Sequence, residues 1–185
     1  MSQQPSADTS VRIAWAADAP EVARVQVAAW RQAYADLLPA EVLDQLDEEA
    51  FAEQWRRSLA SPPDARNRLL VALDHQQVVG FAATGPAEDP DADPIADGTI
   101  TAFHVDPAQT RHGHGSRLLQ ACVDTLVADN FRRALIWLQS TDDVLRTFLT
   151  EAGWGPDGAH RELDLYGDGS VRAKQVRLHT ALVDD

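Results

Sequence analysis

A predicted strand leads straight into a predicted helix through the segment His104-Val-Asp-Pro-Ala-Gln-Thr-Arg-His-Gly-His-Gly-Ser116. Gly113 and Gly115 would let the backbone approach a ligand closely. The first turn of a helix leaves N–H groups without intrahelical partners, and the helix dipole favours negative charge at that end. The order of strand, glycine loop and helix therefore predicts a cradle for a phosphate group.

The same segment reverses the charge of the chain. The whole sequence has 16 basic and 29 acidic residues, a formal net charge of −13 at pH 7. Residues 107–117 contain no acid and include Arg111 and Arg117, an excess of positive charge that suits an anionic ligand. The alternative is a tight junction with solvated arginines. Other phosphate loops do not match, because Gly-Lys-Ser/Thr is missing and Leu118 stands where a dinucleotide-binding loop has its third glycine.

The composition restricts the class of protein. A chain of 185 residues with 44% hydrophobic residues is long and apolar enough for one domain with a real core. Cys122 is the only cysteine, so a disulfide scaffold is excluded. The acidic balance disfavours nucleic acid and anionic membranes as partners. The first ten residues show no secretory signal, and no apolar run approaches the length of a membrane helix, so we expect a cytoplasmic protein.

Hydrophobic periodicity predicts a mixed α/β (α+β) fold. Residues 1–10 are expected to be a disordered lead and residues 11–181 a single domain. Asp18 and Glu21 have the spacing of a capping box, which predicts the start of a long amphipathic helix that ends before Pro39. The other predicted helices cover 42–46, 51–59, 115–129 and 142–152, and the predicted strands cover 11–15, 68–73, 78–84, 99–105, 134–139, 163–166 and 172–178. This order favours helices that cover a mostly antiparallel sheet.

Four segments carry a family resemblance. Ala102-Phe-His-Val-Asp-Pro107, followed by Gly113-His-Gly-Ser-Arg-Leu-Leu119, resembles the acyl-CoA-binding motif of the GNAT superfamily of N-acetyltransferases. Ala29-Trp-Arg-Gln-Ala-Tyr34 looks like the first helix of a common bacterial branch, and Phe148 to Trp154 looks like the end of the family's last helix. The resemblance spans about residues 11–181. It implies a bent sheet of about seven strands with helices on both faces, and acetyl-CoA or another acyl-CoA as co-substrate.

The resemblance also implies a binding site in the opening after the fourth strand. The pantetheine arm would lie against the backbone of Phe103 and Val105, and the pyrophosphate would sit on the N–H groups of residues 111–116. Thr110 stands where the family has Arg or Gln, so the cation is expected one place later at Arg111. The implied cofactor-binding residues are Phe103, Val105, Thr110, Arg111, His112, Gly113, His114, Gly115, Ser116 and Asp142.

The catalytic groups depart from the family pattern. Leu149 stands where the family has the tyrosine that protonates the leaving thiolate, and Thr99 where it often has a glutamate base. His104 is the titratable residue nearest the expected thioester and is the candidate catalytic residue, although strand alternation puts it on the face opposite Phe103. The resemblance thus predicts an N-acyltransferase of weak activity. The alternative is a non-catalytic acyl-CoA-binding sensor or interaction protein.

The acceptor is expected to be a small cationic amine. Residues 36–53 contain seven acids and no basic residue, and in the resembling family this region borders the acceptor site. A solvated helix face explains the same acids equally well. No metal is expected, because His104, His112 and His114 lack the further ligands that a zinc site needs. A homodimer is possible, but the sequence shows no interface.

Overall fold

The computed structural model describes residues 8–182, and within them the chain forms a seven-stranded sheet in the order β1-β2-β3-β4-β5-β7-β6. β4 and β5 run parallel, whereas the other neighbours are antiparallel. The strands are β1 (Thr9–Ile13), β2 (Arg68–Asp74), β3 (Gln77–Pro86), β4 (Asp97–Val105), β5 (Arg133–Gln139), β6 (Gly155–Asp164) and β7 (Arg172–Ala181). The predicted mixed, mostly antiparallel sheet is confirmed.

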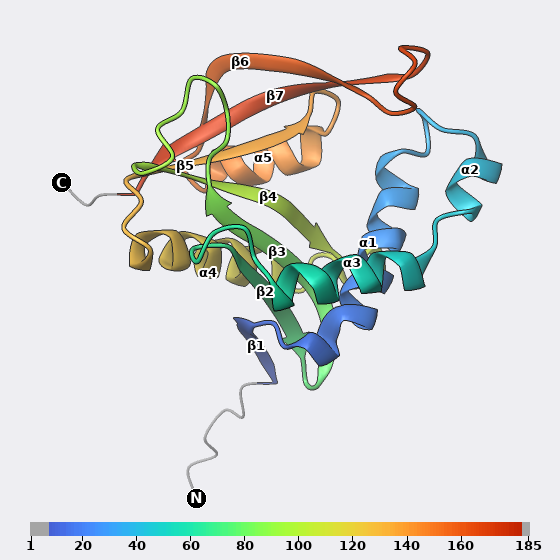
Figure 1. Cartoon of the computed structure of the whole chain (residues 1–185), viewed down its shortest axis with the longest axis horizontal. Coiled ribbons are helices and arrows are strands. Elements are labelled where there is room, and N and C mark those ends of the chain that lie inside the picture. Colours follow the sequence, from blue (N-terminus) through green and yellow to red (C-terminus); the bar gives the residue numbers. More distant parts are fainter. Residues whose placement is uncertain (1–7, 183–185) are drawn as a thin grey trace, which may run out of the picture.

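Helices cover both faces of this sheet (Figure 1). The helices are α1 (Ala19–Ala33), α2 (Ala40–Asp44), α3 (Glu48–Ala60), α4 (His114–Ala128) and α5 (Asp143–Glu151), with short 3₁₀ turns at Ala16–Asp18 and Pro107–Gln109. α1 and α3 pack together on one face, and α4 packs on the other. The β6–β7 hairpin extends past the end of α5 toward α1 and α2.

Each face has its own apolar core. On the α4 face, Leu118, Cys122 and Leu126 project from one side of the helix into a cluster with Ile136 and Leu178. On the α1 face, the helical spacing of Val22 and Val25 brings them against alternate residues of β2 and β3, which include Val71 and Phe81. Cys122 is buried in the first cluster.

The sheet opens between β4 and β5. These strands pair only from Asp97 to Ile100 and from Arg133 to Ile136, after which β5 continues alongside β7 alone. β3 carries a register shift between Ala83 and Thr84, opposite Thr101, and this irregularity bends β4 where the strands part. The opening after the fourth strand is therefore present.

The N-terminal part differs from the sequence-based expectation. Thr9 and Ser10 already belong to β1, so the expected lead extends too far, and its residues 1–7 lie outside the described residues. The predicted capping box is wrong, because the Asp18 side chain does not cap α1. Asp18 instead pairs with Arg12 at 2.7 Å and accepts a bond from the Trp15 N–H. The Glu21 carboxylate accepts a bond from the Val78 N–H and so anchors α1 to β3.

β6 is much longer than the predicted strand at residues 163–166. It begins at Gly155, although Pro156, Asp157 and Gly158 are typical of a turn. β6 is an edge strand with a register shift before His160, so its polar residues face solvent or charged partners instead of a core. Because no apolar alternation marks such a strand, the sequence pattern predicts only its last two residues, 163 and 164.

Candidate functional site

The junction between β4 and α4 has the geometry of an anion cradle. Gly113 is the N-cap of α4 with a φ of 78°, and Arg111 is also left-handed with a φ of 65°. The first N–H of this turn that bonds within the helix is that of Arg117, which donates to the Gly113 carbonyl at 3.2 Å. The N–H groups of residues 114–116 therefore point out of the helix end and are free to bind an anion.

Arg117 folds back over this loop. Its Nη2 donates to the His112 carbonyl at 3.2 Å and approaches His114 Nδ1 at 3.1 Å. Because an arginine can only donate, Nδ1 accepts and the ring proton of His114 is assigned to Nε2. Burial and the Arg117 charge lower the pKa of His114, which is consistent with a neutral ring. Thr110, Arg111, His112 and Ser116 are exposed, so the cradle keeps accessible polar and positive groups.

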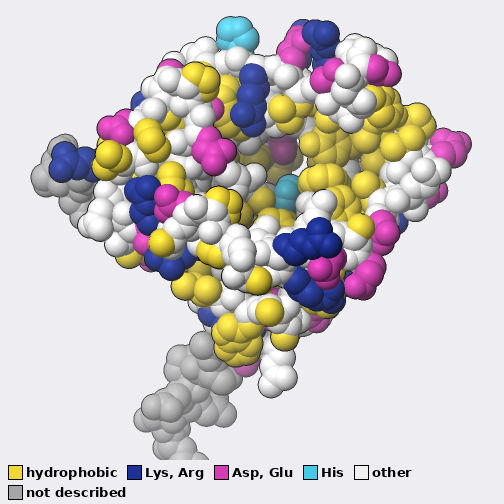
Figure 2. Space-filling view, in the orientation of Figure 1, with side chains coloured by type: hydrophobic (Ala, Val, Ile, Leu, Met, Phe, Trp, Pro, Cys, Tyr) yellow, Lys and Arg dark blue, Asp and Glu magenta, His cyan; other side chains and the backbone are white. Residues whose placement is uncertain are grey.

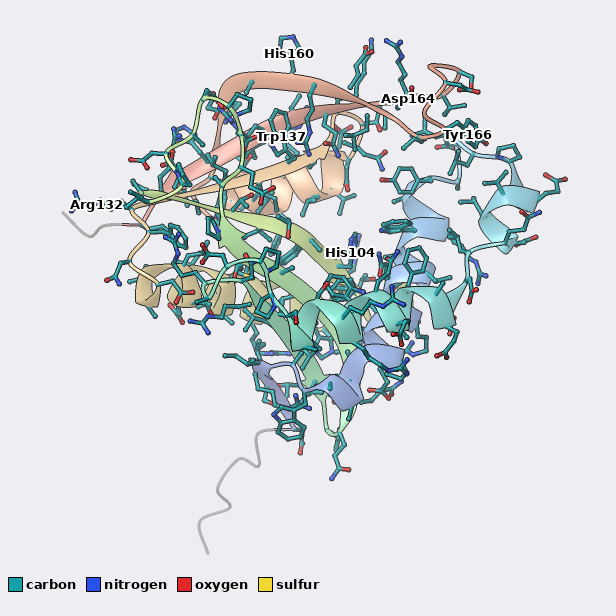
Figure 3. The ribbon with its side chains drawn as sticks, viewed as in Figure 1. His104, Arg132, Trp137, His160, Asp164 and Tyr166 are labelled. Atoms are coloured by element: carbon teal, nitrogen blue, oxygen red, sulfur yellow. The ribbon has the colours of Figure 1, made fainter. Side chains whose placement is uncertain are left out.

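A cavity of about 980 Å³ lies beside the cradle, on the α1 face and in the opening between β4 and β5. Figure 2 shows this hollow, lined largely by hydrophobic side chains, with a histidine on its floor where Figure 3 labels His104. Its walls include Phe103, His104 and Asp142 among the predicted site residues. Val105 packs against the first turn of α4, since its Cγ2 is 3.8 Å from the position of a Cβ on Gly115. β4 therefore links the two parts of the site: Phe103 and His104 line the cavity, and the end of the same strand leads into the cradle.

Neighbouring side chains of β4 point to opposite faces of the sheet. Phe103 stacks against Phe148 of α5 at 6.1 Å, on the α4 side. His104 contacts Phe81 at 5.3 Å between ring centroids, on the α1 side. The predicted alternation of these two residues is thus confirmed. Burial lowers the pKa of His104 to about 4, so the ring is neutral near pH 7. No residue of the described chain forms a hydrogen bond with it.

Two family positions take other roles here. Leu149 is fully buried in the core cluster of the α4 face and is absent from the cavity wall. Thr99 Oγ1 donates to the Leu135 carbonyl at 3.2 Å. Tyr34 does line the cavity, where its hydroxyl interacts with the Gln139 side chain and burial raises its pKa. Helical spacing alone predicts Tyr34 as a core residue, whereas the family resemblance suggests that Trp30 and Tyr34 line an acceptor pocket; both residues do line the cavity.

The loop between β3 and β4 is fastened to β7 by a buried arginine. Arg177 is 4% exposed, and its guanidinium binds Asp91 and Asp157, each at 2.6 Å. The Asp89 carboxylate lies 3.8 Å from the same guanidinium and accepts a bond from Trp137 Nε1 at 2.8 Å. Asp89 and Trp137 line the cavity, so this cluster shapes its wall. The sequence did not reveal it, since Asp91 and Arg177 are 86 positions apart.

The acids of residues 36–53 lie outside the cavity wall. Asp47 caps α3 by accepting from the Glu49 and Ala50 N–H groups. Glu49 and Glu53 pair with Arg56 at 3.2 and 3.4 Å on the exposed surface of α3. These carboxylates therefore cap α3 or form ion pairs on its surface. The acids that line the cavity are Glu88, Asp89 and Asp142.

The family model described as the acetyltransferase (GNAT) family matches residues 27–154. The chain belongs to the GNAT family. This match includes the second half of α1, the opening between β4 and β5, the α4 cradle and α5. A curated relative from Bacillus subtilis (strain 168), the uncharacterized N-acetyltransferase YuaI, is 29% identical over 131 residues, 70% of each chain.

Solved GNAT-like structures share the fold at low identity. The putative acetyltransferase YncA of Salmonella typhimurium, solved with acetyl-CoA, is 16% identical, with a TM-score of 0.66 and 96% of each chain covered. The PaiA N-acetyltransferase of Thermoplasma acidophilum, solved with coenzyme A, is 15% identical, with a TM-score of 0.64 over 90% of this chain and 97% of that one. In the described part of this GNAT chain, no helix is long and apolar enough to cross a membrane.

Proposed function

We propose that this protein transfers an acetyl or other acyl group from acyl-CoA to the primary amine of a small acceptor. The observation that carries the proposal is that one strand, β4, borders both parts of the site. The helix N-terminus at Gly113, just after β4, offers free N–H groups to a pyrophosphate, and the opening between β4 and β5 contains a large cavity. Family membership and neighbours solved with acetyl-CoA or coenzyme A support the same co-substrate.

In this proposal, the cradle residues and Arg111 hold the pyrophosphate. Backbone groups of Phe103 and Val105 are exposed to the opening because β4 has no partner strand beyond Ile100 on that side. They bind the amides of the pantetheine arm. Asp142, the N-cap of α5, uses one carboxylate oxygen to accept from the Leu145 N–H and faces the cavity near the arm.

Transfer then needs one bond formed and one broken. The acceptor nitrogen attacks the thioester carbonyl carbon, the carbon–sulfur bond breaks, and the amine gives up a proton. Unpaired N–H groups of β4 are the donors available to the oxyanion. We assign proton acceptance to His104, since its neutral ring nitrogens are unbonded within the described chain and border the cavity. A thiolate, with a pKa of about 8.5 for an ordinary thiol, leaves without an acid at Leu149.

The acceptor binds as an ammonium group, and it gives up one proton to solvent before its nitrogen attacks and a second one, to His104, afterwards. Glu88 and Asp142 supply carboxylates to the cavity wall, where Asp89 is already engaged by Trp137 and Arg177. Trp30, Tyr34 and Trp55 supply aromatic faces. Carboxylates and aromatic faces both favour a cation. We therefore propose a small cationic acceptor. The groups that favour it are those of the cavity wall, and not the acids of residues 36–53. The cytoplasmic location also stays a prediction.

Calorimetry with acetyl-CoA and coenzyme A, paired with thiol release over a panel of amines, tests the function. We expect micromolar-range binding and turnover with at least one amine. His104→Gln, which keeps a polar side chain without a basic nitrogen, is expected to lower kcat by about 10²-fold with unchanged acetyl-CoA affinity. Binding without turnover on any amine would favour the non-catalytic acyl-CoA binder.

A further inference from the structure

Arg161 lies at the same level as the opening in the sheet. Gln139 of β5 pairs with Gln175 of β7, and Gln175 pairs with Arg161 of β6, so the three residues form one row across neighbouring strands. All three line the cavity. Gln139 is the last residue of β5 and lies on its unpaired stretch, beyond the last pair with β4. The row therefore runs from the opening to the edge of the sheet.

The Arg161 guanidinium is held back over β5. Its carbon atom Cζ lies 4.2 Å from the centre of the Trp137 ring, and Nε donates to Gln175 Oε1 at 2.8 Å. Trp137 is the first residue of β5 after the last one paired with β4, and Figure 3 shows it beneath the β6–β7 hairpin. The stacking and the Nε bond together orient the planar group beside the point where the strands part.

The two terminal nitrogens of Arg161 have no partner in the described chain. Nearby arginines of the sheet are all paired: Arg133 with Asp97, Arg172 with Glu162, and Arg177 with Asp91 and Asp157. Asp89 is the acid that acts on Arg161 electrostatically, but its carboxylate is engaged by Trp137 and faces Arg177. In a chain with an excess of acids, an oriented and unpaired guanidinium at a cavity is suited to an anionic group of a ligand.

We propose that Arg161 binds a carboxylate of the acceptor, which makes the acceptor an amino acid. A guanidinium fork matches the two oxygens of a carboxylate, and such charged pairs are strong and directional. The acceptor's amine then lies toward His104 and the cavity carboxylates, while its carboxylate lies over Trp137. Arg161 is thus a specificity-determining residue. This inference rests on the proposed function, because it concerns the second substrate of the same reaction.

Matched acceptor pairs test the assignment. Lysine is compared with cadaverine and phenylalanine with phenethylamine, since each pair differs by one carboxylate. The wild-type enzyme is expected to prefer the amino acid. Arg161→Gln should lower kcat/KM for the amino acid by about 10- to 100-fold, mostly through KM, and change the amine by less than about 2-fold. Arg161→Lys should lie between them. Arg172→Gln, on the neighbouring strand and paired with Glu162, is the matched control and should change neither substrate.

The outcomes separate the inference from the function. Turnover in which Arg161→Gln affects both members of a pair equally would overturn the role of Arg161 and leave the transferase intact. If no amine or amino acid is acetylated, the proposed function fails. In that case, calorimetry of amino-acid binding to the coenzyme A complex tests whether Arg161 binds a carboxylate. Binding weakened by Arg161→Gln supports the inference, and equal or absent binding overturns it.

Discussion

Gly113 is the residue on which the proposed acyl-CoA site depends most directly. Its φ of 78° lies in the left-handed region, and a Cβ there would come within 3.2 Å of Arg117 Nη1. Gly113→Glu would place bulk and negative charge at the proposed pyrophosphate position, so we expect acetyl-CoA binding to be lost in calorimetry. Gly167→Glu is the matched control, since Gly167 has a similar φ of 77° and open space around it. If both variants lost acetyl-CoA binding equally, the loss would come from backbone strain and not from the cradle.

His104 also predicts a pH dependence of stability. Burial lowers its pKa from 6.5 to about 4 in the folded state, so the unfolded chain binds more protons between these values. The free energy of unfolding should therefore fall as the pH falls from 6.5 to 4, by at most about 3 kcal/mol, and level off below. Urea unfolding of the wild type and His104→Gln at several pH values measures this. An identical pH slope in the two proteins would contradict the assigned burial.

At the scale of elements, the loop of residues 87–96 and the strands β6 and β7 act as one unit. Arg177 of β7 gathers Asp91 from the loop and Asp157 from β6. The side chains of Arg177 and Asp157 are buried, whereas that of Asp91 is exposed, so removal of the cation leaves the Asp157 carboxylate without its partner in a poorly solvated place. This unit supplies Asp89 to the cavity wall, where its carboxylate accepts a hydrogen bond from Trp137 of β5.

Arg177→Met is expected to lower the free energy of unfolding by about 3 kcal/mol, because a buried ion-pair network loses its shared partner. Arg172→Met removes a surface pair with Glu162 and should cost at most about 1 kcal/mol. Urea denaturation of both variants gives the comparison. Similar losses would mean that Arg177 contributes no more than an ordinary surface pair.

At the scale of the whole molecule, two parts of the sheet meet at a short seam. β1 to β4 form one part and β5 to β7 the other, joined through four residue pairs between β4 and β5. A ligand that lies in the opening adds contacts to both parts. Its binding should therefore stabilise the seam more than the distant strands.

Hydrogen exchange with and without coenzyme A tests this coupling. At 100 times the dissociation constant, the ligand stabilises the folded protein by about 2.7 kcal/mol. We expect the amides of residues 101–105 and 137–139 to slow beyond this global effect, because they border the opening. Peptides from β1 and β2 serve as the reference. Equal slowing throughout the sheet would place the ligand somewhere other than the seam.

The sequence by itself determined what depends on near neighbours. Residues three and four apart share a helix face and alternate residues share a strand face, so the order of elements, the glycine cradle and the opposite directions of Phe103 and His104 could be predicted. The family resemblance added the opening after the fourth strand. Single residues near element ends were less predictable, as Asp18 shows, because an ion pair with Arg12 competed with the helix cap.

Only the tertiary structure decided which distant residues meet. Nothing in the local pattern joins Asp91 to Arg177, or brings Arg161 over Trp137. β6 became a full strand because β7 offered an edge, although its own residues favour a turn. Leu149 went into the core and Tyr34 to the cavity, since the packing of α5 and α1 sets which side of each helix faces the opening. Contacts between remote segments depend on how the whole chain buries its apolar residues and pairs its polar groups. No short stretch of sequence contains that information.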